Sequence, residues 1–159
     1  MQIQLYRNCD CDKVIEIYRT AALYLGRQAY TDEQVQAWAT YPEDPREFRR
    51  TLLQGLTLCA VEDGIPVAFG QLNPTDHIAF LYCHPRFARR GYASSLLHKL
   101  ESAALKQNAP LIRTEASAIS RPLFEKNGFR VLAEERPVRR GIEFLRYRME
   151  KTLSRREKS

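Results

Sequence analysis

A strand, a basic turn and a helix follow one another without a break between residues 78 and 106. Residues 78–83 are apolar and rich in β-formers, and Pro85 ends the run. The turn at 86–90 carries three arginines, and Gly91 then opens a segment with helical periodicity. The apolar positions of that segment are Leu96, Leu97, Leu100, Ala103 and Ala104. A chain built around this unit is predicted to form a mixed α/β sheet with helices on its faces.

The turn in this unit has the properties of an anion-binding site. The first amides of a helix lack backbone partners and point outward together. The positive end of the helix dipole adds about 0.3–1 kcal/mol of attraction for a negative group. Gly91 allows close backbone approach, and Arg89 and Arg90 raise the local positive potential. We interpret the turn as a pyrophosphate cradle.

The sequence R-R-G-Y-A-S-S-L-L, which follows His84-Pro85, carries a family resemblance. It resembles the acyl-CoA signature of the GNAT superfamily N-acetyltransferases, usually written Q/R-x-x-G-x-G/A. Gly91 and Ala93 occupy the two small-residue positions. Ala88 stands where Gln or Arg is usual, which removes one side-chain contribution but leaves the backbone cradle unchanged.

The resemblance extends over nearly the whole chain. Residues 117–129 resemble the second CoA motif of the family, which ends in Gly-Phe. Residues 29–39 and 139–151 resemble a small bacterial subgroup of single-domain members. The resemblance implies the GNAT fold: a mixed, mostly antiparallel sheet whose parallel fourth and fifth strands splay apart, with helices on both faces.

Length and composition favour one globular domain. The chain has 159 residues, of which 44% are hydrophobic and 28% charged. We expect a single domain over residues 1–151 and a disordered basic tail over 152–159. No apolar run reaches membrane-spanning length and the first residues lack a signal-peptide pattern, so a cytoplasmic protein is expected. The cysteines lack metal-site spacing, so we expect no metal; they are Cys9, Cys11, Cys59 and Cys83.

Local signals predict the remaining elements. Thr31 and Gln34 resemble a capping box at the start of a helix, and Asp63-Gly64 predicts a hairpin. The expected helices are one from Asp10 or Asp12 to Leu25, one through Trp38, one after Pro45, and one over 119–127 that Gly128 ends. The other expected strands are 2–7, 56–62, 66–72, 77–84, 111–115, 129–137 and 142–149.

The resemblance implies acetyl-CoA as the co-substrate and its place on the sheet. The pantetheine arm is expected to enter between strands 77–84 and 111–115, with the phosphates on the amides of residues 89–94. The amine acceptor would then attack the acetyl carbon directly, without a metal or a nucleophilic residue. The cofactor-binding residues expected are Leu81, Tyr82, Cys83, Arg89, Arg90, Gly91, Tyr92, Ala93, Ser94, Ser117, Ser120 and Phe124.

The acceptor must be deprotonated, because an alkyl ammonium is only about 0.1% neutral near pH 7.4, a cost of about 4 kcal/mol. The family often uses a Tyr of the second motif as general acid, but Phe124 stands there. The subgroup often carries an acidic residue where this chain has Ala79. The candidates that are left are His77, Tyr82, His84, Glu115 and Ser117.

Strand alternation separates these candidates. It predicts that residues 77, 79, 81 and 83 share one face and that residues 82 and 84 lie on the other. They would then not all serve one site. Glu115 ends the next strand beside the gap and is expected to act through water, whereas Ser117 would polarise a water or the thioester.

The acceptor pocket is expected in the N-terminal half of the chain. Tyr24, Tyr30 and Trp38 belong to the segment that resembles the acceptor wall of this fold. Packing in the core remains an alternative role for each of them. As a group we expect them to shape the acceptor pocket.

Three functions compete for this sequence. The leading one is an acetyl-CoA-dependent N-acetyltransferase acting on a small amine or peptide, as a monomer or homodimer without membrane or nucleic-acid partners. The alternative is a non-catalytic acyl-CoA sensor or interaction module, motivated by Phe124 and Ala79. A nucleic-acid-binding domain rests only on the net charge of +6, since no zinc-finger spacing or aromatic-basic interleaving accompanies it.

Overall fold

A computed structural model of the chain describes residues 1–153. The strands are β1 (Gln2–Leu5), β2 (Leu56–Glu62), β3 (Ile65–Leu72), β4 (His77–Cys83), β5 (Leu111–Ser117), β6 (Arg130–Glu135), β7 (Val138–Arg139), β8 (Ile142–Glu143) and β9 (Arg146–Thr152). The α-helices are α1 (Cys11–Leu25), α2 (Asp32–Ala39), α3 (Pro45–Leu52), α4 (Tyr92–Lys106) and α5 (Arg121–Lys126). Short 3-10 helices are η1 (Asn8–Asp10), η2 (Gly26–Gln28) and η3 (Pro85–Phe87).

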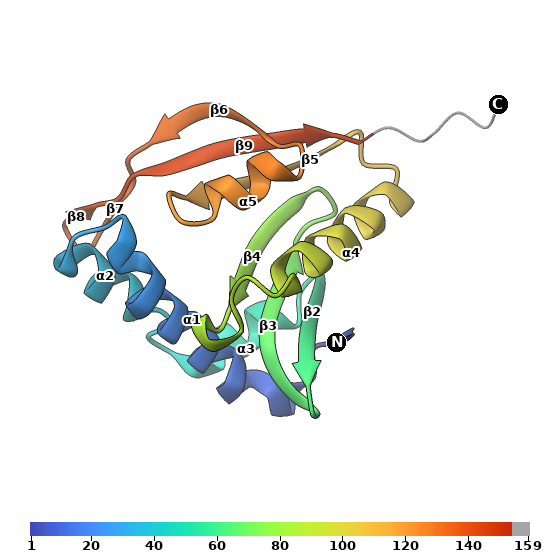
Figure 1. Cartoon of the computed structure of the whole chain (residues 1–159), viewed down its shortest axis with the longest axis horizontal. Helices are drawn as coiled ribbons and strands as arrows, with labels where there is room; N and C mark the ends of the chain where they lie inside the picture. The colour runs from blue at the N-terminus through green and yellow to red at the C-terminus, as the bar shows by residue number, and fades with distance from the viewer. Residues whose placement is uncertain (154–159) are drawn as a thin grey trace.

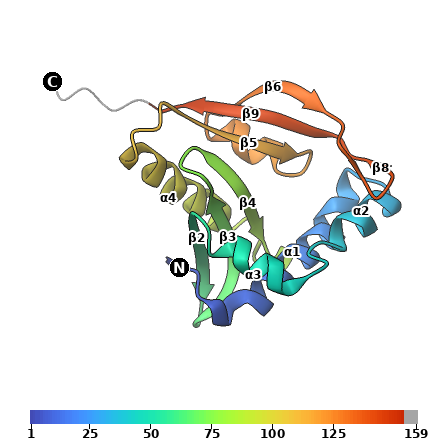
Figure 2. The same cartoon turned by 180° about the vertical axis from the view of Figure 1, so that it is seen from behind.

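Seven strands form one sheet in the order β1-β2-β3-β4-β5-β9-β6 (Figure 1). Every neighbouring pair is antiparallel except β4 and β5, which run parallel. The expected mixed, mostly antiparallel sheet with parallel fourth and fifth strands is confirmed. A second sheet, made of β7 and β8, lies beside α2 (Figure 2).

Short-range sequence signals form the local structure that they predict. Asp63 and Gly64 both have positive φ, 50° and 79°, and they connect β2 to β3 as a tight hairpin. The Thr31 side chain accepts from the Gln34 amide, and the Gln34 side chain in turn accepts from the Thr31 amide at the start of α2. Both predictions are confirmed.

Strands β4 and β5 separate soon after they meet. They pair only at His77 with Arg113 and at Ile78 with Thr114. The Thr114 hydroxyl donates a 3.0 Å hydrogen bond to the Ile78 carbonyl at this last paired position. Beyond this position β4 pairs only with β3 and β5 pairs only with β9, so a fork opens in the middle of the sheet.

A β-bulge interrupts β4 at the mouth of the fork. On β3, Gln71 pairs with Phe80 and the next residue, Leu72, pairs with Ile78. Ala79 therefore has no residue opposite it in the β3 ladder, and the alternation of side chains shifts by one position there.

The bulge changes which side chains share a face. Ile78 packs in the same core as Leu81 and Cys83, whereas Phe80 and Tyr82 pack on the other side of the sheet. His77 lines a cavity together with Phe80 and Tyr82. The prediction that residues 77 and 82 lie on opposite faces is therefore wrong, because simple alternation does not hold across a bulge.

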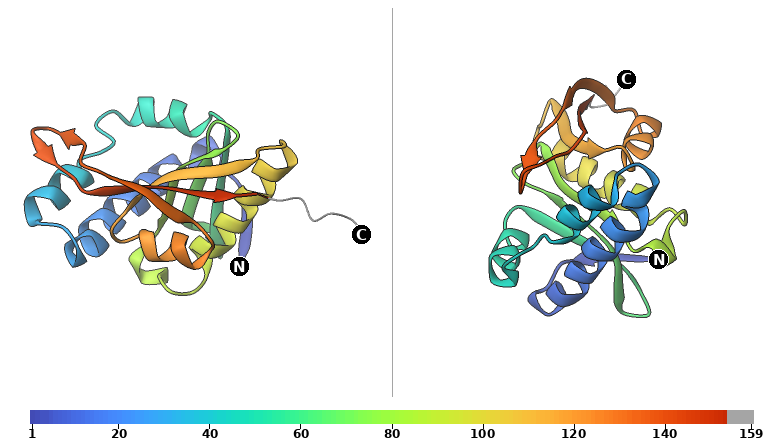
Figure 3. Two further views of the ribbon diagram at one scale, coloured as in Figure 1. Left: turned by 90° about the horizontal axis from the view of Figure 1, so that it is seen from above. Right: turned by 90° about the vertical axis from the view of Figure 1, so that its left-hand side faces the viewer.

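Helices cover both faces of the sheet, as expected. Helix α3 lies on one side of the strands and α4 and α5 lie on the other (Figure 3). Leu96, Leu97 and Leu100 of α4 are fully buried in one core, and Phe48 and Leu52 of α3 are buried in the other. The core under α4 spans the fork from β2 to β9, whereas the core under α3 packs only against β2, β3 and β4.

The C-terminal part differs from expectation in its boundaries. The segment expected as one strand, 142–149, forms β8 and then β9. Strand β9 continues to Thr152, and Leu153 packs against the core. The predicted disordered tail falls mainly on residues 154–159, which lie outside the described residues.

Candidate active site

A cavity of about 380 Å³ occupies the fork between β4 and β5. Helix α4 begins at one of its ends, and α5 lies along its side. Its lining includes every cofactor-binding residue expected from the sequence except Arg90. These lining residues are Leu81, Tyr82, Cys83, Arg89, Gly91, Tyr92, Ala93, Ser94, Ser117, Ser120 and Phe124.

The turn before α4 presents backbone amides to this first cavity. Arg89 and Gly91 both have positive φ, 63° and 86°, which turns the chain sharply into the helix. Nothing lies within 4 Å of the position that a Cβ atom on Gly91 would occupy. Within residues 1–153, the amides of residues 89–94 have no hydrogen-bond acceptor. Such a row of free donors at a helix start suits an anion.

The two arginines of the turn point to different places. Arg89 lines the first cavity. The Arg90 guanidinium instead lies 5.3 Å from the centre of the Phe87 ring and lines a separate surface hollow with Lys13. Only Arg89 therefore adds its side-chain charge to the wall of the first cavity.

The second motif closes the opposite wall. Ser117 and Ser120 bond reciprocally: each hydroxyl accepts from the other residue's amide at 3.0 Å, and the two hydroxyls lie 3.1 Å apart. Phe124 is buried and packs 5.0 Å from the Phe129 ring, measured between centroids. The Ser117 hydroxyl is thus engaged in shaping the wall, and Phe124 contributes an apolar surface.

Two polar groups of the first cavity remain protonated. Burial raises the pKa of the Cys83 thiol to about 11, so the thiolate is scarce at neutral pH. The Tyr92 hydroxyl donates a hydrogen bond to a Glu62 carboxylate oxygen, and this bond raises the pKa of Tyr92.

A second cavity of about 480 Å³ opens on the other side of β4. Its aromatic lining residues are Tyr18, Tyr30, Trp38, Tyr41, Phe80, Tyr82 and Phe144. The residues that it shares with the first cavity are Trp38, Ile78, Ala79, Phe80, Tyr82, Glu115 and Ser117. The two cavities therefore meet at the fork.

The three expected acceptor-wall residues do not lie together. Trp38 lines both cavities, and Tyr30 packs edge-on against it with 5.7 Å between ring centroids. The Tyr30 hydroxyl also accepts from the Ala118 amide and donates to the Leu145 carbonyl, both at 2.8 Å. Tyr24 lines neither cavity and is 65% exposed.

Tyr82 is held inside the aromatic cluster. Its ring lies 4.7 Å from Tyr18 and 6.3 Å from Trp38, measured between centroids. Burial raises the pKa of Tyr82, while hydrogen bonding with Trp38 and Tyr18 opposes this effect. The hydroxyl therefore keeps its proton at neutral pH.

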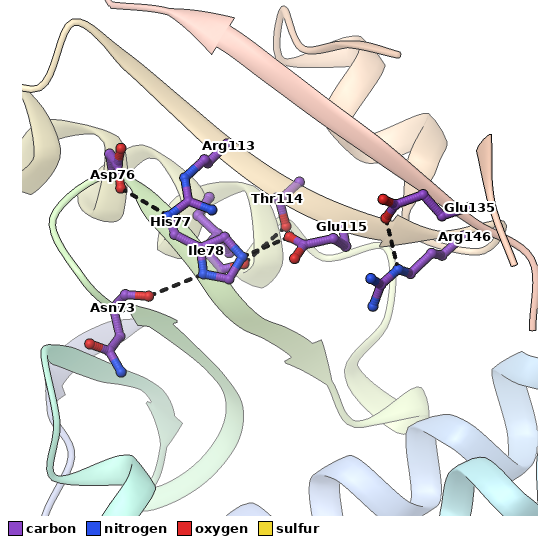
Figure 4. A network of polar contacts seen from close by, with 9 residues as sticks. All are labelled: Asn73, Asp76, His77, Ile78, Arg113, Thr114, Glu115, Glu135 and Arg146. Carbon is purple, nitrogen blue, oxygen red and sulfur yellow. Dashed lines mark hydrogen bonds and ion pairs between the residues drawn. The ribbon is translucent and has the colours of Figure 1, made fainter. Parts of the chain in front are cut away.

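His77 and Glu115 form a close pair at the fork (Figure 4). The Nε2 atom of His77 lies 2.7 Å from the Oε2 atom of Glu115, and its Nδ1 atom lies 3.1 Å from the Asn73 carbonyl oxygen. Both partners are acceptors, so this geometry favours an imidazolium that donates from both nitrogens. The two side chains are 19% and 31% exposed.

Each member of the pair shifts the other's pKa. The hydrogen bond to Glu115 raises the pKa of His77 against the opposing effect of burial. The hydrogen bond from His77 lowers the pKa of Glu115, and the charges of Arg146 and Arg113 act in the same direction. His84 lines neither cavity and instead accepts from the Arg86 amide through Nδ1.

Sequence reasoning did not single out several side chains of the second cavity, among them two tyrosines and two arginines. Tyr18 follows a helical apolar pattern that is equally typical of core, and Tyr41 precedes a proline in a loop. Arg139 ends β7 and Arg146 begins β9, in a part of the chain where the sequence indicated only a turn and a strand. No local signal distinguishes them from surface residues.

Residues 1–153 contain neither a membrane-spanning helix nor a cluster of metal ligands. No helix there is long and apolar enough to cross a bilayer. No group of three or more His, Cys, Asp or Glu side chains in the same range is placed to hold a metal ion.

Known proteins are similar to this chain in sequence and in fold. The family model for the acetyltransferase (GNAT) domain matches residues 27–151. The uncharacterized N-acetyltransferase YafP of Escherichia coli K12 is 29% identical over 150 residues, which cover 94% of each chain.

Solved structures of N-acetyltransferases have the same fold as this chain. A crystal structure of a GCN5-related N-acetyltransferase from Rhodopseudomonas palustris superposes with a TM-score of 0.93 at 29% identity, over 96% of this chain and 95% of that one. The PaiA N-acetyltransferase of Thermoplasma acidophilum, solved with coenzyme A, has a TM-score of 0.76 at 20% identity, over 96% and 98% of the two chains. At that identity the likeness concerns the fold alone. Since the family model spans most of the chain, this protein belongs to the GNAT family of acetyltransferases.

Proposed function

We propose that this chain is an acetyl-CoA-dependent N-acetyltransferase that transfers an acetyl group directly to a primary amine of a small molecule or peptide. The meeting of the two cavities at the fork carries the proposal. One cavity adjoins the free amides of residues 89–94, and the other is a separate aromatic chamber. Glu115 lines both, so an amine in the second cavity would reach a group held in the first.

The first cavity fits acetyl-CoA. The free amides of residues 89–94 and the Arg89 side chain would hold its phosphates, and the edge of β4 beyond Ile78 would pair with its pantetheine arm. Ser117, Ser120 and Phe124 would form the facing wall. When bound, acetyl-CoA supplies a thioester carbonyl as the electrophile.

Glu115 is the base that we assign. Its Oε2 atom is held by His77, and within residues 1–153 its Oε1 atom has no hydrogen-bond partner. This free oxygen is available to accept the ammonium proton through an ordered water. His77 acts as a positioning residue that fixes the carboxylate at the fork.

Tyr82 and Cys83 complete the assignment. The Tyr82 hydroxyl keeps its proton and lines both cavities, so it is available to donate a hydrogen bond where negative charge develops on sulfur. Cys83 stays a neutral thiol because burial raises its pKa to about 11. It is therefore a poor nucleophile, which supports direct transfer from a ternary complex over a covalent acyl-enzyme.

A CoA-release assay tests this function. The chain is incubated with acetyl-CoA and a panel of small amines and peptides, and free thiol is measured alongside acetylated product. We expect amine-dependent release with one thiol for each acetylated amine. Binding of acetyl-CoA without any amine-dependent release would instead support the non-catalytic sensor.

A further inference from the structure

The arginines in and just before the β7–β8 hairpin differ in their partners. Arg136 pairs with Glu143 at 3.4 Å, and Arg140 pairs with Glu43. Arg139, which lies between them, has no acidic partner among the described residues. It is also the hairpin arginine that lines the second cavity. Its charge is therefore uncompensated at the place where an acceptor would enter.

The other charged groups of this cavity cancel in pairs. His77 and Glu115 form one pair at 2.7 Å. Arg146, which also lines the cavity, pairs with Glu135 at 3.0 Å (Figure 4). With these pairs balanced, Arg139 leaves the cavity with one net positive charge.

Arg139 also acts on the interior of the cavity. Its positive charge lowers the pKa of Tyr18, Tyr41 and Tyr82, against the raising effect of burial, which is the largest influence on each. All three tyrosines line the same cavity. The charge of Arg139 therefore acts on the aromatic lining of the cavity, although the residue itself is solvent-exposed.

We propose that the acceptor is an amine that also carries an oxyanion, a carboxylate or a phosphate, and that Arg139 binds this oxyanion. The inference rests on the proposed function and names the class of its second substrate. An ammonium alone would enter a cavity of like charge, whereas an amine with an attached anion satisfies both Arg139 and Glu115. A guanidinium suits the task because its planar fork of donors matches carboxylate and phosphate oxygens.

The walls indicate what joins the two charged groups. Tyr18, Tyr30, Trp38, Tyr41 and Phe144 surround the space with aromatic rings. Rings of this kind favour an apolar or aromatic body over a strongly hydrated one. L-phenylalanine is therefore a suitable probe, and phenethylamine is its partner without the carboxylate.

The test is steady-state acetylation of two matched pairs of acceptors. The first pair is L-phenylalanine and phenethylamine, and the second is O-phosphoethanolamine and ethanolamine, which separates a carboxylate from a phosphate source. Each acceptor is assayed with the wild type, Arg139→Gln and Arg140→Gln. Arg140→Gln removes the same charge from the same hairpin, but Arg140 does not line the cavity.

We expect the anionic member of at least one pair to have a kcat/KM at least about tenfold above its neutral partner, mainly through KM. Arg139→Gln should remove this preference, and Arg140→Gln should keep it. Equal or better use of the neutral amines, or an equal loss for both classes in Arg139→Gln, would overturn the inference while the proposed function stands. Absence of amine-dependent release from all four acceptors would also overturn the inference, and the wider panel of amines and peptides would then decide on the proposed function.

Discussion

The Nε2 atom of His77 on β4 lies 2.7 Å from the Oε2 atom of Glu115 on β5, at the point where the two strands separate. The last residues that pair across these strands are Ile78 and Thr114. The ion pair thus joins the halves of the sheet at the fork and places a carboxylate between the two cavities.

Replacing Glu115 by Gln should lower kcat by about 100-fold, because an amide cannot accept the ammonium proton. The shape of the side chain is kept, so the Kd for acetyl-CoA should change little. Glu125→Gln is the matched control, since Glu125 is exposed, pairs with Arg121 at 2.9 Å and lines neither cavity. Equal kcat values for the two variants would argue against Glu115 as the base.

The His77–Glu115 pair should make stability depend on pH. The pKa of His77 is raised above its ordinary 6.5, so its contribution is full below pH 6.5 and is lost as pH rises through the raised value. The pKa of Glu115 is lowered below its ordinary 4.5, so its contribution is present above pH 4.5 and is lost as pH falls through the lowered value. The pair therefore stabilises most between pH 4.5 and 6.5.

Urea unfolding of the wild type and His77→Gln at pH 5.5 and pH 8.5 checks this. The difference in unfolding free energy should be larger at pH 5.5. His98→Gln serves as the control, because His98 is exposed and contacts an amide oxygen of Asn127 instead of a carboxylate. The same difference at both pH values for His77→Gln would show that the pair is not ionised as inferred.

Charge reversal in the turn before α4 should separate its two arginines. Arg89→Glu should weaken acetyl-CoA binding by about tenfold, because Arg89 lines the first cavity and its charge acts on the phosphates. Arg90→Glu should weaken binding clearly less, because Arg90 lies over Phe87 and outside that cavity. Isothermal titration calorimetry gives both Kd values, and equal weakening would show that both side chains reach the phosphates.

Tyr30→Phe should lower the free energy of unfolding by about 1–3 kcal/mol, since the Ala118 amide and the Leu145 carbonyl both lose a partner. Tyr24→Phe removes a hydroxyl from an exposed ring and should change stability by less than about 0.5 kcal/mol. Urea titration of the two variants measures the difference. Equal stability of both would mean that the Tyr30 bridge is not formed.

Features of the fold that depend on neighbouring residues could be predicted from the sequence. The Asp63-Gly64 hairpin needs only positive φ at two positions, and the Thr31–Gln34 capping box needs two side chains three residues apart. The turn at Gly91 belongs to the same class. Each is decided by hydrogen bonds within a few residues, so local patterns contain enough information.

The arrangement of the candidate site depends on pairing between distant segments. The bulge at Ala79 exists only in the ladder between β3 and β4, and no residue type within β4 predicts it. It brings His77 to the face of Tyr82, which simple alternation excluded. Arg139 reaches the second cavity because the β7–β8 hairpin lies beside α2, a contact that its own sequence does not encode.

A crystal structure of the chain with acetyl-CoA is the most direct test of the claim that acetyl-CoA binds in the fork between β4 and β5. We predict that the diphosphate lies on the amides of residues 89–94 and that the pantetheine arm runs between β4 and β5, with the acetyl group near Glu115. A diphosphate bound elsewhere, or β4 and β5 closed against each other along their full length, would contradict the proposed acetyl transfer.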